Sequence, residues 1–513
     1  WLTTMDIDIK GKIIDTLIAA PIVDENRFRF DLNSLAKDYL QESKSETQLR
    51  EAAKMWGLDP KADLWKLPAS HVGTYAEQDA AVTLRLWQHL QKEIAGQNLI
   101  NIFQLETDLF PVLFEMKRKG VRVNLDKAEI IKNDLQKEEE KLLQSIKKLA
   151  GTSVEIWAAA SVAKAFDALS IPYNHTETGK PSFDKNFLSS HESPLAKMVV
   201  KAREINKART TFIDSILKHS HRGRIHAEIH QMRSDQGGTV TGRFSYSNPN
   251  LQQIPARNQI IGPLIRSIFI PEKNHQWGIF DYSQQEPRLV VHYAAIKSFT
   301  GASKFVEAYQ EEESTDFHSL VAEMADIGRK QAKTINLGLF YGMGKGKLMS
   351  QLGVDQETAT DLLVAYHERV PFVKKLINDT MNRAGKKGYL RTLLGRRCRF
   401  DLWEPSNEWG SKALPLKEAT NEYGESMIKR AWTYKALNRL IQGSAADQTK
   451  QAMVNLHKEG YTAHIQVHDE LDFSIASEKD SANIKDIMEN CVELLVPSKV
   501  DVELGESWGD AGD

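Results

Sequence analysis

A histidine and two acidic residues stand together in the run Gln466-Val467-His468-Asp469-Glu470-Leu471. Polarity alternates along residues 461–467, and apolar residues recur at every second position over residues 471–475, which is typical of β-strands. The pattern predicts a short hairpin that holds Asp469 and Glu470 exposed at its tip. Carboxylates in such a position favour metal binding over packing, because burying an unpaired carboxylate is costly. A solvated structural turn is the alternative that this run alone leaves open.

A third carboxylate, Asp281, lies within residues 278–288. An apolar, strand-like run ends at Asp281, and a helix then begins, with Pro287 tolerated in its first turn. A carboxylate at a strand end, beside the carboxylates of a hairpin, could hold a pair of Mg²⁺ ions whose remaining positions are open to water and phosphates. Taken alone, the run also fits an ordinary strand-to-helix turn.

Cationic side chains follow one face of a helix predicted over residues 329–342. Four residues spaced four apart share that face: Arg329, Lys333, Leu337 and Tyr341. Two cations, then an apolar and an aromatic residue, could hold a triphosphate at one end and a sugar and base at the other. His318, upstream of the helix, could add a third donor to the phosphates. A solvated basic face is the common alternative, but such a face would not continue into an apolar one.

In order and spacing, these runs resemble motifs A, B and C of the A-family, polymerase-I-like DNA polymerases. Residues 241–255 resemble the signature ahead of motif A, and residues 438–447 resemble the helix ahead of motif C. Matching runs extend from about Leu105 to the C-terminus. The resemblance implies a multidomain α+β and α/β fold, a right-hand polymerase of the phage type with palm, fingers and thumb, and template-directed DNA synthesis.

The N-terminal region resembles part of an RNase H-like 3′–5′ exonuclease domain. Tyr75 and Asp79 stand in a run similar to the third exonuclease motif, and Asp15 in one similar to the second, although Gly11 replaces the usual asparagine. The chain begins at Trp1 rather than at methionine. We therefore expect a fragment that lacks the first exonuclease motif and in which proofreading is incomplete.

The resemblance assigns roles to the residues of the polymerase motifs. Asp281, Asp469 and the backbone carbonyl of Tyr282 would hold two Mg²⁺ ions, with Glu470 in a supporting position. Lys333 would also donate a proton to the leaving pyrophosphate. The nucleotide-binding residues would be Arg329, Lys333, His318, Leu337, Tyr341, Glu286 and Gln284. Glu286 beside Tyr341 would exclude a 2′-hydroxyl, although a carboxylate in a first helical turn can also simply cap the helix.

A further group matches family positions that contact primer and template: Arg243, Asn250, Gln252, Asn438, Gln442 and His468. A basic group in the thumb would follow the phosphate backbone: Lys201, Lys207 and Arg209. Two positions depart from the family. Leu337 stands where most cellular relatives carry phenylalanine, and Tyr434 where bacterial enzymes have an arginine that contacts DNA, a role that Lys435 could take over.

Length and composition set the outer limits. The 513 residues should form several domains. We expect a partial exonuclease domain over 1–100, thumb and connecting helices over 101–235, palm over 236–290, fingers over 291–430 and palm again over 431–513. Residues 1–100 mix strand-like and helical patterns, and helices are expected from about 290 to 430. Apolar residues spaced along 131–149 predict a long amphipathic helix that stops at Gly151. Two cysteines, no signal peptide and no long apolar run favour a cytoplasmic protein, in the host cell if it comes from a phage.

The net charge of −2 does not exclude a nucleic-acid binder, because a local basic lining is sufficient. We expect a monomer. The short connection after residues 211–217 leaves no room for a thioredoxin-binding thumb insertion. Two other functions remain to be weighed: a catalytically idle DNA-binding scaffold, which the intact carboxylate pair opposes, and a repair nuclease, which the incomplete exonuclease motifs oppose.

Overall fold

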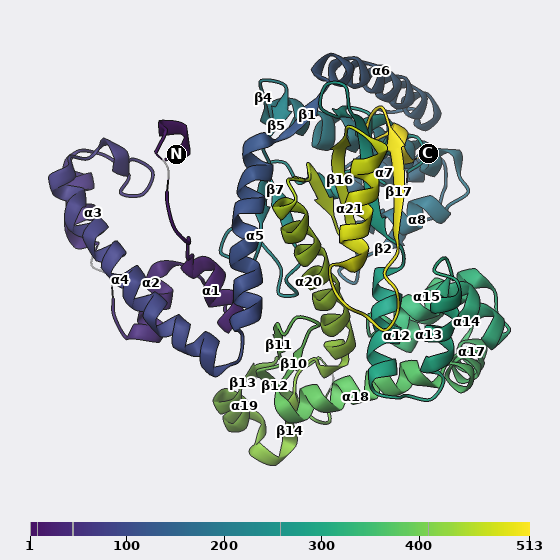
Figure 1. The fold of residues 1–513 in the computed structure, drawn as a ribbon. Helices are drawn as coiled ribbons and strands as arrows, with labels where there is room; N and C mark the ends of the chain where they lie inside the picture. The colour runs from purple at the N-terminus through teal and green to yellow at the C-terminus, as the bar shows by residue number, and fades with distance from the viewer. Residues whose placement is uncertain (1, 8, 44–45, 257, 409, 513) are drawn as a thin grey trace.

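The computed structural model describes residues 2–7, 9–43, 46–256, 258–408 and 410–512, so Trp1 lies outside it. At its centre is an antiparallel sheet with the strand order β15-β16-β9-β17 (Figure 1). The strands are β9 (Gln276–Tyr282), β15 (Ile465–Val467), β16 (Glu470–Ile475) and β17 (Val500–Gly505). The predicted hairpin is confirmed, with β15 and β16 as its strands.

Two helices and a second sheet pack with this central sheet in one hydrophobic core. The helices are α20 (Ala436–Lys458) and α21 (Glu478–Asn490). The second sheet has the order β4-β5-β1-β8 and is formed by β1 (Val121–Val123), β4 (Ser220–His221), β5 (Arg224–Ile225) and β8 (Phe269–Ile270). Further elements here are α5 (Ile100–Lys119), β6 (Glu228–His230), β7 (Ser245–Ser247), η5 (Leu251–Gln253), α11 (Ile261–Arg266) and η8 (Asp510–Gly512). Helix α5 lies directly against α20.

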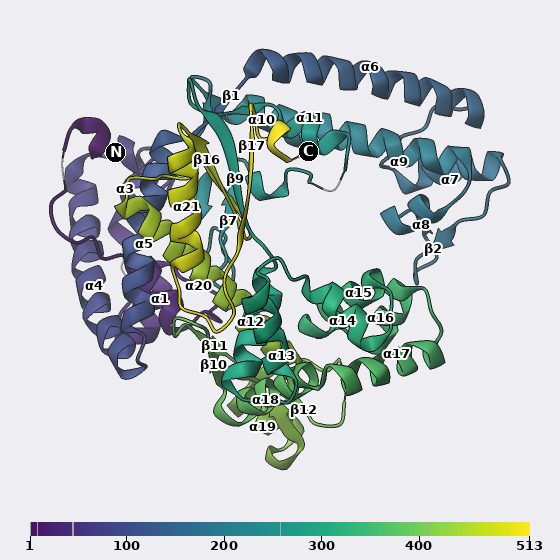
Figure 2. The same ribbon diagram turned by 45° about the vertical axis from the view of Figure 1, so that its right-hand side comes forward.

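One arm with its own hydrophobic core extends from this body (Figure 2). It contains α6 (Leu125–Ala150), α7 (Ala159–Ala168), β2 (Asn174–His175), β3 (Pro181–Ser182), α8 (Lys185–Ser190), α9 (Pro194–Lys207), η4 (Ala208–Ile213) and α10 (Asp214–His219). The long amphipathic helix predicted to stop at Gly151 is confirmed as α6. Gly151 adopts φ 70°, a left-handed conformation that ends a helix and that glycine reaches without strain.

A second arm carries the predicted basic helix and has a separate core. Its helices are α12 (Gln285–Ile296), α13 (Ala302–Glu311), α14 (Phe317–Ala325), α15 (Arg329–Phe340), α16 (Lys345–Leu352), α17 (Gln356–Arg369) and α18 (Pro371–Lys387). Seen in Figure 2, this arm and the α6–α9 arm project from the central sheet on the same side. The predicted helix over 329–342 is thus confirmed as α15, with Tyr341 as its C-cap.

The expectation of helices throughout residues 290–430 is wrong for its last part. After α18 the chain forms β10 (Tyr389–Arg391), β11 (Arg397–Arg399), β12 (Leu402–Pro405), β13 (Leu414–Pro415), α19 (Leu416–Tyr423), η6 (Glu425–Met427), β14 (Ile428–Arg430) and η7 (Thr433–Lys435). A glycine at φ 76°, Gly388, ends α18, and Gly395 turns β10 back onto β11. Such turn residues favour short paired strands.

The N-terminal region is helical in the part of it that the structure describes. It contains η1 (Thr3–Met5), α1 (Thr16–Val23), α2 (Leu32–Leu35), η2 (Ala36–Leu40), α3 (Thr47–Met55), η3 (Leu64–Lys66) and α4 (Ala69–Gly96). The mixture of strands and helices expected here is therefore wrong for these residues. The alternating side chains of Ile7, Ile9 and Ile13 are exposed, because no neighbouring strand pairs with them within residues 2–7 and 9–43.

The N-terminal helices pack against α5, which stands between them and α20 in Figure 1, and Glu25 also pairs with Arg399 of β11. Among the described helices, none combines the length and the apolar composition that crossing a bilayer requires.

Candidate active site

Asp281 and Asp469 are brought together by the pairing of β9 with the β15–β16 hairpin. Asp281 stands directly opposite Glu470 in the register, and the backbone N–H of Tyr282 donates to the carbonyl of Asp469 over 3.2 Å. His468 adopts φ 57° in the hairpin turn, which reverses the chain just before Asp469. Two aspartates far apart in the sequence therefore lie together at one end of the strands of the central sheet.

The carboxylates at this end of the sheet repel one another. Burial, together with the charges of Asp469, Glu470 and Asp501, raises the pKa of Asp281 to about 8. Burial and the charge of Glu286 also raise the pKa of Asp469 above its usual value. Within the described residues, neither aspartate side chain forms an ion pair. Asp469 and Glu470 are half-buried rather than exposed as predicted, because β9 lies alongside them, whereas His468 in the turn is exposed.

Aromatic side chains hold the carboxylate of Glu470 in place. The indole nitrogen of Trp508 donates to its Oε1 over 3.1 Å, and Trp508 stacks on Trp277 with ring centroids 6.1 Å apart. Burial raises the pKa of Glu470. The fully buried Asp472, two residues further on, accepts a hydrogen bond from the indole of Trp277 over 3.2 Å. Glu470 is thus fixed next to Asp281.

Glu286 joins three separate parts of the chain. Its Oε2 accepts a 2.7 Å hydrogen bond from the hydroxyl of Tyr341, and its Oε1 forms a 2.5 Å ion pair with Arg243. Glu286 lies in the first turn of α12, Tyr341 at the end of α15, and Arg243 in the loop before β7. Both predictions for Glu286 are compatible with this arrangement, since it lies in the first turn and also beside Tyr341.

The cations of α15 face outward, as the four-residue spacing predicts. Arg329 is bound to the carboxylate of Asp316 over 2.6 Å and contacts the hydroxyl of Ser319 at 3.2 Å. Lys333 is exposed and makes no hydrogen bond or ion pair among the residues that the structure describes. Leu337 follows one turn later and is half-buried. The opposite face of α15 is buried and includes Ile335 and Asn336.

His318 is buried, and its protonation is set by neighbours. The hydroxyl of Tyr366 donates to Oδ1 of Asn336 over 2.5 Å, so the amide nitrogen of Asn336 donates to Nδ1 of His318 over 2.9 Å. Burial lowers the pKa of His318 to about 4. The imidazole is therefore neutral at pH 7 with its proton on Nε2, where it remains a hydrogen-bond donor.

The side chain of Gln284 has hydrogen-bond partners within the chain. Its side chain donates to the carbonyl of Thr315 over 3.1 Å and accepts from the backbone N–H of Phe317 over 2.7 Å. It adopts φ 54° at the junction of β9 and α12. These bonds connect the end of the central sheet to the start of α14, so the side chain links two elements of the site.

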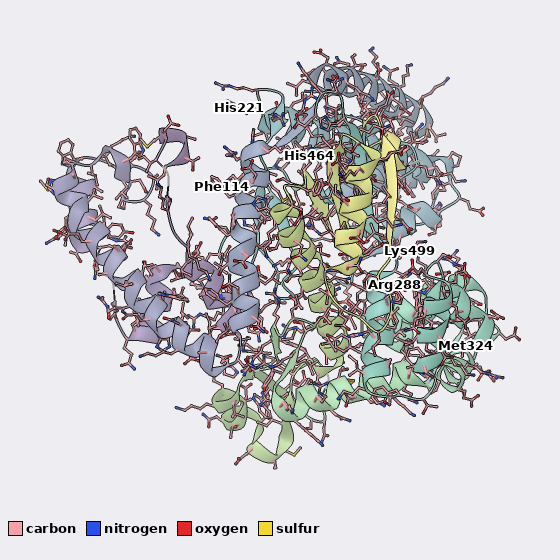
Figure 3. All side chains as sticks on the ribbon, viewed as in Figure 1. Phe114, His221, Arg288, Met324, His464 and Lys499 are labelled. Atoms are coloured by element: carbon pink, nitrogen blue, oxygen red, sulfur yellow. The ribbon has the colours of Figure 1, made fainter. Side chains whose placement is uncertain are left out.

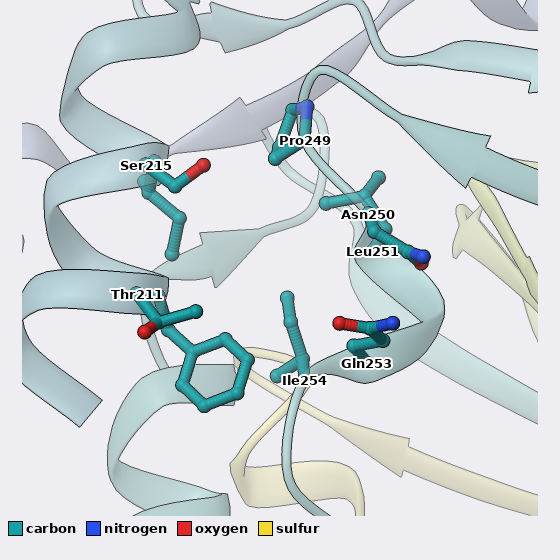
Figure 4. Close-up of a pocket in the computed structure, with 9 residues that line it drawn as sticks. Thr211, Ser215, Pro249, Asn250, Leu251, Gln253 and Ile254 are labelled. Atoms are coloured by element: carbon teal, nitrogen blue, oxygen red, sulfur yellow. The ribbon is translucent and has the colours of Figure 1, made fainter. Parts of the chain in front are cut away.

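Several predicted DNA contacts surround the hairpin. Gln252 donates to Oε1 of Gln466 over 3.0 Å and lies near His468, and Asn250 caps η5, which packs against β15 of the hairpin. Asn250 also lines a cavity of about 140 Å³ between η5 and the η4–α10 segment of the first arm (Figure 4). Asn438 and Gln442 lie half-buried, four residues apart on α20.

The basic residues predicted to follow the DNA backbone have intramolecular partners. Lys201 pairs with Glu138 over 2.6 Å, and Arg209 pairs with the buried Glu139 over 2.9 Å. The ammonium group of Lys207 lies 5.8 Å from the ring centroid of Phe212. Lys201 and Lys207 on α9 are exposed, whereas Arg209 is half-buried.

The residues assigned to the exonuclease motifs lie on two helices. Oδ1 of Asp15 caps α1 by accepting from the N–H of Leu17 over 2.8 Å, and Tyr75 and Asp79 lie on α4. Helices α1 and α4 pack together. Within the described ranges, no group of three or more histidine, cysteine or acidic side chains is arranged to hold a metal ion by itself.

Two residues of the site escaped sequence reasoning. Asp501 on β17 stands directly opposite Asp281, on the other side from Glu470. Arg288 holds the segment that follows β9 in place. Its guanidinium donates to the carbonyls of Ser283 and Pro497 and lies 4.4 Å from the ring centroid of Tyr309. Figure 3 shows Arg288 beside Lys499, where the sheet meets α12. No local sequence pattern identifies Asp501, because its position opposite Asp281 depends on the long-range pairing of β17 with β9.

Comparisons with known proteins agree with this geometry. The profile described as DNA polymerase family A matches residues 125–510, and the one described as 3′–5′ exonuclease matches residues 1–95. A DNA-directed DNA polymerase of Pseudomonas phage M6 is 36% identical, over 96% of this chain and 79% of its own. The DNA polymerase DpoZ of Acinetobacter phage SH-Ab 15497 is 30% identical, over 95% and 82%.

A solved structure has the same fold along the whole chain. It is described as the POL domain of Pol1 from M. smegmatis in complex with a DNA primer-template and dNTP. The similarity covers 100% of this chain and 84% of that chain, with a TM-score of 0.80 and 26% sequence identity.

Proposed function

Because the chain belongs to DNA polymerase family A, we propose that Asp281 and Asp469 form its catalytic centre for adding deoxynucleotides to a primer 3′-hydroxyl. The chain is a DNA-directed DNA polymerase, and its N-terminal residues belong to a 3′–5′ exonuclease domain. The observation that carries the assignment of the centre is the pairing of β9 with the hairpin, which brings the two aspartates to one end of the sheet.

The donor set at this end of the sheet fits divalent cations. Asp281 and Asp469 are partly buried, and their pKa values are raised because burial and neighbouring acids disfavour the charged forms. Hard carboxylate oxygens without a cationic partner suit Mg²⁺, and we propose that these two side chains and the carbonyl of Tyr282 hold two such ions. When bound, the ions would supply Lewis-acid stabilisation of the primer oxygen and of the triphosphate.

The outward face of α15 supports a role in binding the triphosphate. Lys333 presents an ammonium group that is free to bind a phosphate oxygen and to donate its proton to the leaving pyrophosphate. Arg329, already oriented by Asp316, would bind a second phosphate oxygen. The neutral His318, with its proton on Nε2, would donate a hydrogen bond without adding charge.

We propose that Glu286 and Tyr341 together limit the space at the sugar of the incoming nucleotide. The 2.7 Å bond between them fixes both side chains, so neither can move aside for a 2′-hydroxyl without breaking it. Arg243 balances the charge of Glu286 and would also reach the minor-groove edge of the primer end. Leu337 stands in place of an aromatic residue, so the rest of this pocket would lack a rigid aromatic face.

Primer and template would cross the hairpin and α20. Asn250, Gln252 and His468 lie around the hairpin, and Asn438 and Gln442 lie on α20. Short polar groups of this kind suit contacts to groove edges that all four base pairs share. We propose that Lys201 and Lys207 follow the duplex backbone. For Arg209 the ion pair with buried Glu139 supports a structural role beside any contact with phosphate.

Broader features of the proposed enzyme rest on the expectations from the sequence. We propose the domain limits given above, a monomer, and synthesis without a thioredoxin-type partner, since η4 leads through α10 directly into β4 and β5. The phage relatives support DNA replication in an infected cell, in its cytoplasm, as the setting.

Single-nucleotide primer extension with Mg²⁺ tests the catalytic assignment. Asp281→Asn and Asp469→Asn should each reduce the rate at least about a thousandfold while the proteins still bind primer-template. Asp326→Asn, at a left-handed C-cap on α14, serves as an exposed control and should extend primers normally. Substantial extension by Asp469→Asn would contradict the proposed centre.

A further inference from the structure

Four charged side chains are enclosed between α5, α20 and the β10–β11 hairpin. They are Glu106 and Lys450, each fully buried, Asp447, also fully buried, and Arg396, 4% exposed, and we call them the buried charge cluster. Lys450 bonds to Oε1 of Glu106 over 2.7 Å, and Nε of Arg396 bonds to Oδ1 of Asp447 over 2.9 Å. Arg396 also binds Glu106. Two positive charges thus balance two negative ones.

The ionisation of the cluster depends on its partners. Burial alone would raise the pKa of Glu106, but Lys450 and Arg396 hold that pKa below its usual value. Burial lowers the pKa of Lys450 to about 8, although Glu106 opposes the change. Because each charge is paired inside the core, displacing any one of them would leave an unpaired buried charge. The four side chains of the cluster are therefore held in fixed positions.

The loop that carries Arg243 contacts the buried charge cluster on both sides of that residue. On one side, the guanidinium of Arg396 lies against Gly242, where an added Cβ would come within 2.8 Å of its Nε. On the other side, the ammonium of Lys450 lies 4.9 Å from the ring centroid of Phe244. Gly242 adopts φ 83°, so glycine is required here for both conformation and space.

Arg243 itself points away from the cluster, toward Glu286. Its 2.5 Å ion pair with Glu286 continues to the hydroxyl of Tyr341. The two residues adjacent to Arg243 in the sequence are thus the two that the cluster contacts. A displacement of the cluster would move the Arg243 backbone and loosen the pair with Glu286.

We propose that the buried charge cluster is a positioning device that sets Arg243, and through it the preference of the polymerase for deoxynucleotides over ribonucleotides. This rests on the proposed role of Arg243 and Glu286 at the nucleotide sugar. No member of the cluster touches substrate in this scheme. Its effect should appear in substrate selection rather than only in stability.

The test removes one pair of opposite charges and keeps the cluster neutral. In Glu106→Gln/Lys450→Met, the pair of Arg396 with Asp447 remains. We expect the ratio of kcat/KM for a deoxynucleotide to that for the matching ribonucleotide to fall at least about fivefold. The fall should come from improved ribonucleotide use and a higher KM for the deoxynucleotide, with thermal unfolding confirming a folded protein.

A matched control removes a buried pair elsewhere. Arg399 pairs with the buried Glu25, and the other hydrogen bonds of its guanidinium run to Ile22 and Gln97 rather than to residues 241–244. Glu25→Gln/Arg399→Met should lower the unfolding temperature yet keep the selection ratio. An equal change of the ratio in this control would overturn the proposal, because general destabilisation would then explain the effect.

Two further variants keep the test decisive. Phe244→Leu removes the ring beside Lys450 while all four charges stay, so it should also lower the selection ratio. It replaces the double variant as the test if that variant does not fold. An unchanged ratio in Phe244→Leu would overturn the proposal. Arg243→Ala should lower the ratio at least as much. If Arg243→Ala changes selection and the cluster variants do not, only the positioning role fails. If Arg243→Ala leaves selection unchanged, the proposed role of Arg243 fails with it.

Discussion

The hydroxyl of Tyr341 donates a 2.7 Å hydrogen bond to Oε2 of Glu286 and so joins the end of α15 to the first turn of α12. Helix α12 follows directly from the strand that carries Asp281. Helix α15 carries the proposed triphosphate ligands. One hydrogen bond therefore connects the two elements between which the incoming nucleotide would lie.

Removing this connection should relax sugar selection. Glu286→Ala opens space and also releases Arg243, so we expect the preference for deoxynucleotides to fall by about tenfold or more. Tyr341→Phe keeps the ring and loses only the bond, so its effect should be smaller. Competitive incorporation of deoxy- and ribonucleotides measures both. Glu311→Ala, an exposed change on α13, is the control, and unchanged selection in Glu286→Ala would defeat the assignment.

Arg329→Ala should weaken nucleotide binding. A charge-assisted hydrogen bond to phosphate contributes about 1.5–3 kcal/mol, so kcat/KM for the nucleotide should fall by about 10- to 100-fold, mainly through KM. Lys330→Ala is the matched control, because it removes an exposed cation from the next position of the same helix. Steady-state kinetics with varied nucleotide concentration distinguishes the two. Equal losses in both variants would indicate a general effect of charge.

Tyr366→Phe should disturb His318 without touching it. The change leaves Oδ1 of Asn336 without its donor in a buried site, which should cost about 1–3 kcal/mol of stability. Asn336 would then be free to rotate and to offer its oxygen to His318, moving the imidazole proton to Nδ1. Nitrogen NMR of the imidazole reports that tautomer directly.

Tyr309→Phe provides the comparison for this variant. The Tyr309 hydroxyl is buried in the same core and has no hydrogen-bond partner among the described residues. Its removal should leave stability nearly unchanged or raise it. A large loss in Tyr309→Phe, or none in Tyr366→Phe, would contradict the relay from Tyr366 through Asn336 to His318.

Mg²⁺ should stabilise the protein more at pH 8.5 than at pH 6. The pKa of Asp281 is raised to about 8 in the folded state, so its protonated form is favoured there and stability is lost as pH rises toward and through 8. A cation relieves the repulsion of the charged carboxylates, whereas at lower pH protons compete with it. Thermal unfolding with Mg²⁺ or EDTA at both pH values measures this, and Asp281→Asn should abolish the difference.

Acid should weaken the fold through His464. This residue, labelled in Figure 3, stacks on Trp277 and shares a 2.7 Å hydrogen bond with Ser474. Burial lowers its pKa to about 3, below the unfolded value, so stability is full above about pH 6.5 and is lost as pH falls toward 3. His464→Gln should flatten the loss of unfolding free energy between pH 6.5 and 4. An unchanged slope would show that other groups govern it.

The sequence predicted the local parts of the site well. The four-residue spacing on α15 and the alternation around the hairpin are each encoded within about a dozen residues, and the structure confirms both. The proximity of Asp281 and Asp469 could be expected only through the resemblance to known polymerases, because no local pattern specifies which strands pair.

Features that depend on distant packing could not be predicted. Asp501 looks like an ordinary exposed acid until the register of β17 places it opposite Asp281. The hydrogen bond that Gln284 accepts from Phe317 depends in the same way on how α14 packs against the end of β9. The buried charge cluster draws on residues separated by several hundred positions, and a lone glutamate on an apolar helix gives no local sign of its partners.

The placement of β9 between β16 and β17 has a consequence for biosynthesis. Asp281 leaves the ribosome long before either neighbouring strand has been translated, so β9 must wait with both of its hydrogen-bonding edges vacant. Its apolar side chains are open to wrong partners during that interval. A nascent polymerase would therefore gain activity only after residue 505 has emerged, and slow translation between residues 282 and 470 would prolong its exposure to aggregation or to chaperones.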